Sequence, residues 1–413
     1  MDSRLIFHID VNSAFLSWES TRRVKNGEPD LRLIPAIIGG DRESRHGVVL
    51  AKSIPAKQYG IATGEPIVSA LQKCPHLELA KPDFALYQRC SRAFVEICKK
   101  YAPIVEQFSI DECFLDMSNT KRIYPNPLSI AETIKNEIRD NLGFTVNVGI
   151  GSNKLLAKMA SDFEKPDKIH TLFLSEIQEK MWKLPVRDLF TVGKSTADRL
   201  VGAQIFTIGN LANADVDRLR AMFGVKAGEH LHRYANGIDN SPVLEEAENA
   251  KGYSNSTTLA EDIITFEEAH RVLLALCDSV TSRMRNDRCY TTCISVTIRG
   301  NDFRDHSHQK KLSTPTNITS TVFDTAKSLF AELWDKHTPL RLLGVSLTAL
   351  TQEEGTQISM FPDEKEWKKQ ELDKIIDTIR GRFGSNTLMR GSTMKYSKSV
   401  AQKHKIPPNN DKN

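Results

Sequence analysis

The alternation of apolar and polar residues in positions 1–170 predicts strands and helices in a mixed order. Short apolar or alternating runs, typical of strands, occupy residues 4–10, 48–53, 104–109, 112–117 and 145–151. Apolar residues recur at helical spacing in residues 85–103, 129–143 and 153–166. Ser129 and Glu132 predict a capping box in the second of these helices. This order predicts an α+β fold with helices on one face of a sheet and an insertion, at about residues 20–75, that forms a small subdomain.

The pattern changes after residue 171. Residues 172–240 contain several short helical patterns, and residues 241–252 are polar and acidic, as in a linker. Residues 253–350 combine helical patterns with alternating strands and predict a second α+β domain. Residues 351–413 are polar and predict a tail with little folded structure.

Length and composition are those of a soluble globular protein. A chain of 413 residues is too long for one ordinary core, so we expect about two to four domains. Its longest apolar runs are far too short to cross a membrane, and the N-terminus lacks an apolar signal core. The seven cysteines include no Cys-x-x-Cys, which disfavours zinc and disulfides and indicates a reducing cytoplasm.

Charge is concentrated at the C-terminal end. The net charge is only +4, but residues 362–413 hold 12 Lys and Arg against 7 Asp and Glu. The remainder of the chain is therefore not globally basic. If it binds nucleic acid, we expect binding through local patches.

Three acids lie at the ends of predicted strands. Asp10 ends the first strand, and Asp111 and Glu112 lie within the otherwise apolar run EQFSIDECFLDMS at 106–118. Because side chains alternate along a strand, Asp111 and Glu112 should point to opposite faces. One interpretation is an acidic hairpin turn with solvated carboxylates. The other is a site for two divalent cations, with Mg²⁺ favoured by the oxygen ligands, that supports phosphoryl transfer.

Two lysines and one phenylalanine are candidates for binding a nucleotide. Lys154 follows a Gly-Ile-Gly-Ser turn at the start of a helix, which suits a triphosphate, and Lys57 lies in the insertion. Phe15 follows the first strand, where a ring could exclude a 2′-hydroxyl by its volume. The ordinary alternatives are two surface lysines and a phenylalanine of the core.

Two further segments are candidates for contacts with macromolecules. The turn Val192, Gly193, Lys194 between helical patterns is typical of a helix-hairpin-helix, whose backbone amides contact DNA phosphates. Its ordinary alternative is a helix cap. The pentapeptide QISMF, with Gln357, Met360 and Phe361, places an apolar pair in a polar tail and predicts docking into a partner. Its alternative is a packing anchor for the tail.

Taken together, these residues resemble the Y-family of translesion DNA polymerases, which includes the bacterial polymerase IV and polymerase V types. The resemblance rests on DVNSAF at 10–15, SIDE at 109–112 and GIGSNKLLAKMASDFEKP at 149–166, and it extends from residue 4 to about residue 350. Each piece is weak alone, whereas the ordered set is specific.

The resemblance implies a right-hand polymerase with a ferredoxin-like palm, small fingers, a helix-hairpin-helix thumb and an α+β little finger. It assigns the palm to 1–20 and 76–171, the fingers to 21–75, the thumb to 172–240, a linker to 241–252, the little finger to 253–350 and a tail to 351–413. Ile54 and Lys57 depart from many members, which carry Tyr and Arg there, so a looser grip on the triphosphate is expected.

The resemblance also implies roles for individual residues. Asp10, Asp111, Glu112 and the carbonyl of Val11 would bind two Mg²⁺ ions. Phe15 would be the steric gate, Lys57 and Lys154 would meet the triphosphate, and Val192, Gly193 and Lys194 would contact DNA. QISMF is similar to the sliding-clamp-binding pentapeptide of bacterial polymerases.

The expected activity is template-directed, error-prone DNA synthesis from dNTPs on primed DNA, without proofreading, by a cytoplasmic monomer that binds the sliding clamp and no membrane. Two rivals remain at this point. A nucleotidyl cyclase would use the same acids on NTPs without a template. A DNA-binding scaffold recruited by the clamp would use the acids only structurally.

Overall fold

The computed structural model of the chain describes residues 4–40, 47–245, 249–352, 364–384 and 387–401. It divides into two compact units. The first contains the chain up to residue 247 except residues 41–46, and the second contains the remainder. Within the described ranges, no helix combines the length and the apolar character that crossing a membrane requires.

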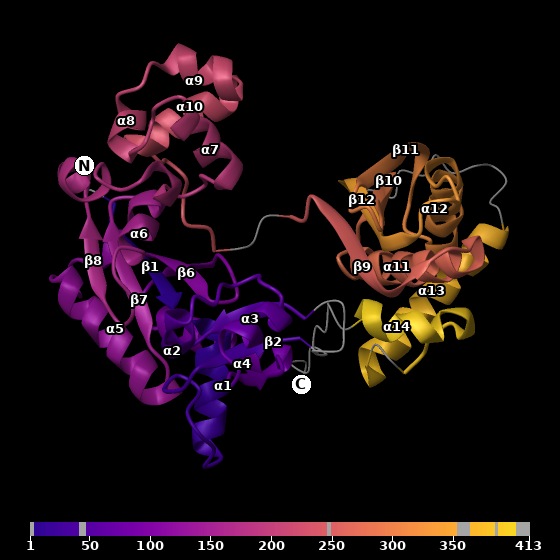
Figure 1. Cartoon of the computed structure of the whole chain (residues 1–413), viewed down its shortest axis with the longest axis horizontal. Coiled ribbons are helices and arrows are strands. Elements are labelled where there is room, and N and C mark those ends of the chain that lie inside the picture. Colours follow the sequence, from indigo (N-terminus) through magenta and orange to yellow (C-terminus); the bar gives the residue numbers. More distant parts are fainter. Residues whose placement is uncertain (1–3, 41–46, 246–248, 353–363, 385–386, 402–413) are drawn as a thin grey trace. The chain divides into compact units, whose positions relative to one another are not determined.

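The first unit is built around a five-stranded sheet with the order β5-β6-β1-β7-β8 (Figure 1). All neighbours are antiparallel except β7 and β8, which are parallel. The strands are β1 (Ile6–Val11), β5 (Ile104–Gln107), β6 (Glu112–Asp116), β7 (Val146–Gly151) and β8 (Ile169–Leu172). The central strand β1 is therefore the one whose end both β6 and β7 flank.

Alternate residues of β1 face opposite sides of this sheet. Phe7 and Ile9 lie in the main hydrophobic core of the unit together with residues of α4 (Phe84–Lys99) and α5 (Pro127–Leu142). Helix α5 begins earlier than the sequence predicts. Its cap is Asn126, with a proline in the first turn, so the predicted capping box at Ser129 is wrong.

The opposite face of the sheet carries α6 (Lys154–Ser161). Two glycines of β7 allow this helix to lie unusually close. A Cβ atom on Gly149 would lie 1.9 Å from the carbonyl oxygen of Ala157, and one on Gly151 would lie 2.7 Å from the backbone nitrogen of the same residue. The glycines therefore bring the side chains of α6 down to the level of the strand ends.

The insertion forms a small subdomain, as the sequence predicts. Its three-stranded sheet has the order β3-β2-β4, and Ile37, Val49 and Ile67 belong to its own core. Helix α1 crosses the boundary expected at residues 20 and 21. The elements are α1 (Ala14–Lys25), β2 (Ala36–Gly39), β3 (Val49–Lys52), α2 (Ile54–Gln58), α3 (Ile67–Lys73) and β4 (Glu78–Ala80).

Residues 172–240 are helical and short-segmented, as predicted. Their apolar side chains share a core with Leu155, Leu156 and Met159 of α6. Two 3-10 turns, η2 (Leu174–Glu176) and η4 (Val186–Asp188), and a π-helical turn between them, η3 (Ile177–Met181), precede the first α-helix of this part. The α-helices are α7 (Lys194–Gly202), α8 (Ile208–Ala212), α9 (Val216–Phe223) and α10 (Val225–Ala235).

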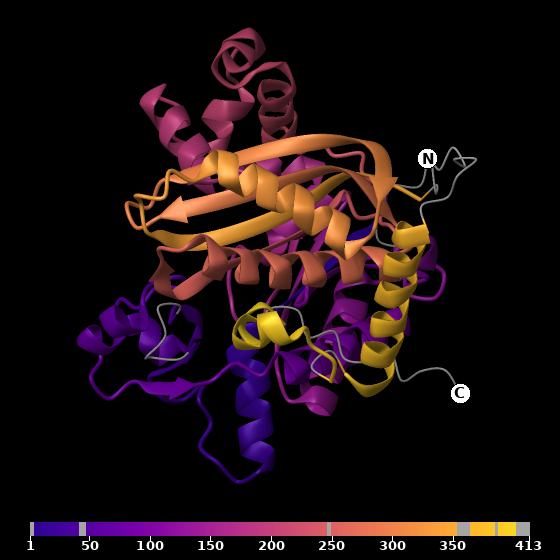
Figure 2. The same ribbon diagram turned by 90° about the vertical axis from the view of Figure 1, so that its right-hand side faces the viewer.

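The second unit has a four-stranded antiparallel sheet with the order β11-β10-β12-β9. Helices α11 and α12 lie side by side along it (Figure 2). Helices packed on a sheet are the α+β arrangement that the pattern of residues 253–350 predicts. The elements are β9 (Gly252–Ile263), α11 (Phe266–Asn286), β10 (Tyr290–Gly300), β11 (Asp305–Thr316), α12 (Thr319–Leu333) and β12 (Leu340–Thr351).

The tail contains more structure than its composition predicts, because α13 (Glu364–Phe383) and α14 (Met394–Ala401) are helices of the second unit. Polar contacts attach α13. Arg285 of α11, almost fully buried, donates to Asp377 (Nε–Oδ2 2.6 Å) and pairs with buried Asp373 (3.3 Å). Asp373 also accepts the backbone N–H of Thr319 at the start of α12 (2.8 Å). The polar composition of the tail therefore does not predict a helix whose attachment depends on buried ion pairs.

Candidate active site

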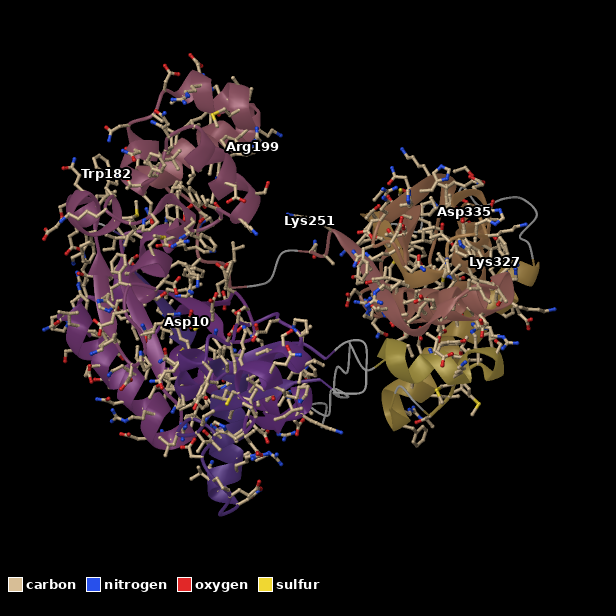
Figure 3. The ribbon with its side chains drawn as sticks, in the orientation of Figure 1. Asp10, Trp182, Arg199, Lys251, Lys327 and Asp335 are labelled. Atoms are coloured by element: carbon tan, nitrogen blue, oxygen red, sulfur yellow. The ribbon has the colours of Figure 1, made fainter. Side chains whose placement is uncertain are left out.

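Two of the predicted acids face each other across neighbouring strands. Asp10 and Glu112 are register partners of antiparallel β1 and β6, so their side chains leave the same face of the sheet. Asp10 is only 7% exposed. The labelled Asp10 in Figure 3 marks where the cluster lies in the first unit.

The third acid, Asp111, lies just before β6 begins. Its carbonyl oxygen accepts the backbone N–H of Val11 (3.0 Å), which ties the end of β1 to the turn. Its carboxylate accepts the hydroxyl of Ser109 (2.6 Å). Because Asp111 precedes the strand, simple alternation does not decide where its side chain points. It lines the same pocket as Asp10.

Two lysines that the sequence analysis did not single out neutralise these acids. Lys158 of α6 lies 2.7 Å from Glu112 Oε1 and 3.6 Å from Asp10 Oδ2, measured from its Nζ. Lys165 lies 3.0 Å from Asp10 Oδ2 and 2.8 Å from Asp162. Both lysines belong to the quoted stretch LAKMASDFEKP, but its pattern does not indicate which lysines reach the strand ends.

The two facing carboxyls differ in acidity. Burial raises the pKa of Asp10 to about 6, although Lys165 and Lys158 oppose the shift. Burial would also raise the pKa of Glu112, but the nearby His8 ring and the hydrogen bond from Lys158 outweigh it and hold that pKa well below the usual range. Because Lys158 is closer to Glu112 than to Asp10, its positive charge stabilises the ionised form of Glu112 more strongly. Burial lowers the pKa of His8.

A cavity of about 530 Å³ opens beside this cluster. Its wall includes the first residues of α1, whose leading backbone N–H groups have no partner within the helix. Ser13, just before α1, has the left-handed backbone φ of 48° that turns the chain there. The lining consists of Asp10–Phe15, Leu50–Ile54, Lys57, Thr63, Asp111, Lys165 and Pro166. An anionic ligand would thus meet a helix N-terminus and three lysines, of which Lys52 already donates to the carbonyl oxygen of Ile61.

Phe15 packs against other aromatic rings and also lines the cavity. Its ring stacks on buried Tyr87, with centroids 4.6 Å apart and planes 9° apart, and meets Phe84 edge-on at 6.0 Å. It also lines the cavity next to Asp10. The ring is therefore part of an aromatic cluster that fixes its position at the cavity wall.

The two predicted lysines lie in different surroundings. Lys57 is exposed and lines the cavity. Lys154 does not; its Nζ binds both oxygens of Glu106 on β5 (2.6 and 2.7 Å) and lies 4.8 Å from the centre of the Phe114 ring. The structure therefore brings Lys57, but not Lys154, to the acids.

The donor set fits hard divalent cations, although the side chains as they stand do not enclose one. In the described part of the chain, no three His, Cys, Asp or Glu side chains are arranged to hold a metal ion. Asp10 and Glu112 face lysine ammonium groups instead. These ammonium groups lie against the carboxylate oxygens that a cation would bind. Burial raises the pKa of Asp10 beside them, and a bound cation would favour its ionised form.

The remaining predicted residues lie away from the acids or outside the described residues. Val192 is buried, Gly193 caps α7, and Lys194 is its exposed first residue. The preceding Thr191 has a left-handed φ of 76°. Gln357, Met360 and Phe361 lie outside the described residues.

Three family models match the chain. Residues 9–162 match the impB/mucB/samB family, and residues 250–360 match the C-terminal domain of the same family. Residues 187–239 match the thumb domain of DNA polymerase iota. The three matches follow the order of the parts described above.

Curated relatives match almost the whole chain. One, named DNA polymerase IV, from Clostridium acetobutylicum, is 47% identical over 94% of this chain and 98% of its own length. Another of the same name, from Clostridium kluyveri, is 36% identical over 96% and 100%. Among solved structures, a Y-family DNA polymerase chimera matches 84% of this chain and 100% of its own with a TM-score of 0.72; at 23% identity it supports the fold.

Proposed function

Because the chain belongs to the Y-family of translesion DNA polymerases and is a DNA-directed DNA polymerase, we propose that Asp10, Asp111 and Glu112 form its catalytic metal site. The observation that carries this proposal is the pairing of Asp10 with Glu112 in register, beside a cavity that Asp111 and three lysines also line. The predicted right-hand α+β fold is confirmed.

The three carboxylates and the carbonyl of Val11 would hold two Mg²⁺ ions. Bound there, the ions would supply the Lewis-acid stabilisation that the transfer of a nucleotidyl group to a primer 3′-hydroxyl needs. Asp10 and Asp111 both line the cavity, which supports their proposed role as ligands. Glu112, the first residue of β6 and the register partner of Asp10, would complete the ligand set.

The cavity wall would bind the triphosphate of the incoming dNTP. The N-terminus of α1 offers backbone N–H groups, and Lys57 and Lys165 offer ammonium groups, all on the lining of one cavity. Lys165 would have to leave Asp10, its partner at 3.0 Å. For Lys154, which we predicted to bind the triphosphate, the contact with Glu106 supports a structural role instead.

Phe15 would select deoxynucleotides. Its ring cannot retreat easily, because Tyr87 lies flat against it. Replacing Phe15 by valine should raise incorporation of rNTPs relative to dNTPs by about 10-fold or more, since a rigid obstruction to the 2′-hydroxyl is removed. Equal rNTP-to-dNTP ratios for the variant and the wild type would contradict this role.

Contacts with primed DNA would come from both units. In the first, the turn Val192, Gly193, Lys194 starts α7 with an exposed lysine and free helical N–H groups. In the second, β11 is an edge strand with nearly all residues exposed, including Lys310 and Lys311. Both surfaces suit phosphate contacts that do not read sequence.

Three further features belong to this proposal. Among the described residues, no separate group of acids is arranged to hold the metals of an exonuclease, so we expect no proofreading. The small fingers subdomain would check the base pair loosely and allow synthesis across lesions. QISMF would recruit the monomeric enzyme to the sliding clamp.

Primer extension with Mg²⁺ on an undamaged primed template tests the function. The wild type should extend the primer, and Asp111→Ala with Glu112→Ala should bind the same DNA without extending it. Extension by the double variant would overturn the metal-site proposal. Omitting the template tests the cyclase alternative, since only a cyclase would still consume nucleotide.

A further inference from the structure

A buried histidine lies directly behind the proposed metal site. His8 precedes Asp10 by two residues on β1, so both side chains leave the same face of the sheet. Its ring is 0% exposed and lies against Phe114, with centroids 4.6 Å apart. Its Nε2 lies 3.7 Å from Glu112 Oε2, the carboxylate oxygen other than the one that Lys158 binds.

The two ring nitrogens of His8 differ in their partners. Nδ1 lies 2.8 Å from the hydroxyl oxygen of Ser161 on α6. Nε2 has no hydrogen-bond partner among the described residues, although it is fully buried. A buried polar atom without a partner is destabilising, and this one lies 3.7 Å from a carboxylate oxygen.

The proton of Ser161 decides which ring nitrogen carries hydrogen. The Ser161 hydroxyl lies 2.8 Å from the carbonyl oxygen of Lys158 as well as 2.8 Å from His8 Nδ1, and its single hydrogen can serve only one of them. If Ser161 donates to Lys158, neutral His8 donates from Nδ1 and turns a bare Nε2 lone pair toward Glu112. If Ser161 donates to Nδ1, the hydrogen is on Nε2 and faces the carboxylate.

We propose that His8 and Ser161 position the carboxylate of Glu112 for a divalent cation, with Ser161 donating to Nδ1 and His8 donating from Nε2 to Oε2. The inference rests on the proposed function, because it takes Glu112 as a cation ligand. The Nε2–Oε2 distance needs to shorten by only about 0.7 Å to become an ordinary hydrogen bond.

Such a bond would leave Oε1 as the oxygen available to a cation. Lys158 binds this oxygen at 2.7 Å and would be replaced there by the cation. Carboxylate ligands of metals are commonly held from behind by a second hydrogen bond that fixes their orientation. His8 is therefore a positioning residue: it acts through Glu112.

Two variants separate hydrogen bonding to Glu112 from packing against Phe114. Glutamine carries an amide nitrogen at the ε position, where it can replace Nε2, whereas asparagine reaches only the δ position. We would measure Mn²⁺ binding to the full chain on primed DNA by electron paramagnetic resonance, together with the Mg²⁺ concentration for half-maximal extension. His8→Asn should weaken Mn²⁺ binding about 10-fold and raise the Mg²⁺ concentration for half-maximal extension about 10-fold. His8→Gln should keep both quantities within about 3-fold of the wild-type values.

A spectroscopic measurement on the wild type does not depend on whether the variants fold. The ¹⁵N shifts of the His8 ring should show the hydrogen on Nε2, and a hydrogen on Nδ1 would overturn the inference. Equal metal binding by the Asn and Gln variants would also overturn it.

Glu112→Gln distinguishes failure of the inference from failure of the proposed function. If this variant loses Mn²⁺ binding while His8→Asn keeps it, only the inference fails. If Glu112→Gln binds Mn²⁺ as the wild type does, Glu112 is not a ligand and both fail.

Discussion

Replacing Asp10 with asparagine should stabilise the metal-free protein while it removes the activity. Burial raises the pKa of Asp10 from 3.8 to about 6, so its ionised form is less favourable in the folded protein than in the unfolded chain. A shift of this size corresponds to about 3 kcal/mol at neutral pH. Asparagine resembles the protonated acid, so the variant should gain up to about 3 kcal/mol of unfolding free energy.

The sign of this effect sets its pH dependence. A carboxyl with a raised folded-state pKa removes stability as pH rises from its unfolded pKa near 4 through about 6. The difference between Asp10→Asn and the wild type should therefore be nearly absent below pH 4, about half developed at pH 5 and complete at pH 7. In a unit of this size, about 3 kcal/mol corresponds to roughly 6–12 °C in Tm.

Thermal unfolding in EDTA at several pH values measures this difference. Asp198→Asn, a change on the exposed side of α7, is the matched control and should shift stability by less than about 0.5 kcal/mol. Adding Mg²⁺ should stabilise the wild type but not the Asp10 variant. If the variant is no more stable than the wild type at pH 7, or if its gain in stability is as large at pH 4, ionised Asp10 does not destabilise the folded protein and the reasoning is refuted.

Three further predictions concern the lysines near the site, the packing of α6 on the sheet, and the attachment of α13 in the second unit. Lys165→Ala should raise the KM for dNTP about 10-fold or more, because Lys165 lines the cavity, whereas Lys154→Ala should leave the KM within about 3-fold of the wild-type value. Steady-state incorporation measures both values, and a larger effect of Lys154→Ala would contradict our assignment. Gly149→Ala should cost more than about 4 kcal/mol or prevent folding, because its Cβ would overlap Ala157, whereas Gly202→Ala, with open space around it, should be neutral or slightly stabilising in thermal unfolding. Asp373→Ala should destabilise the second unit by about 3 kcal/mol, because it removes a buried partner of Arg285 and the group that accepts the N–H of Thr319 at the start of α12. Limited proteolysis should then release α13, and an unchanged digestion pattern would contradict the prediction.

Local patterns of apolar residues in the sequence predict most of the strands and helices of the first unit. The strands β1, β6 and β7 and the helices α4 and α6 are recoverable from apolar periodicity, because each buries one face or one stripe. The start of α5 was missed because Asn126 and a following proline cap it earlier than Ser129. Competing caps a few residues apart cannot be ranked without knowing where the helix packs.

The tail was misjudged for a different physical reason. Helix α13 has few apolar residues on its attached side and is held by Asp373 and Asp377 against Arg285. Hydropathy treats every charge as a reason for exposure. Whether two opposite charges meet in a buried place depends on contacts between residues almost 90 positions apart, which no local pattern contains.

The choice among the lysines of residues 149–166 shows where sequence reasoning ends. Lys154 and Lys158 are four residues apart on α6, so they lie on one side of the helix and look equivalent. The strands beneath them give the two lysines different partners: Lys154 pairs with Glu106 of β5, and Lys158 pairs with Glu112 of β6. Only the strand order β5-β6-β1 places the second lysine, and not the first, above Asp10. That order is a property of the assembled sheet, and it decides which charges reach the site.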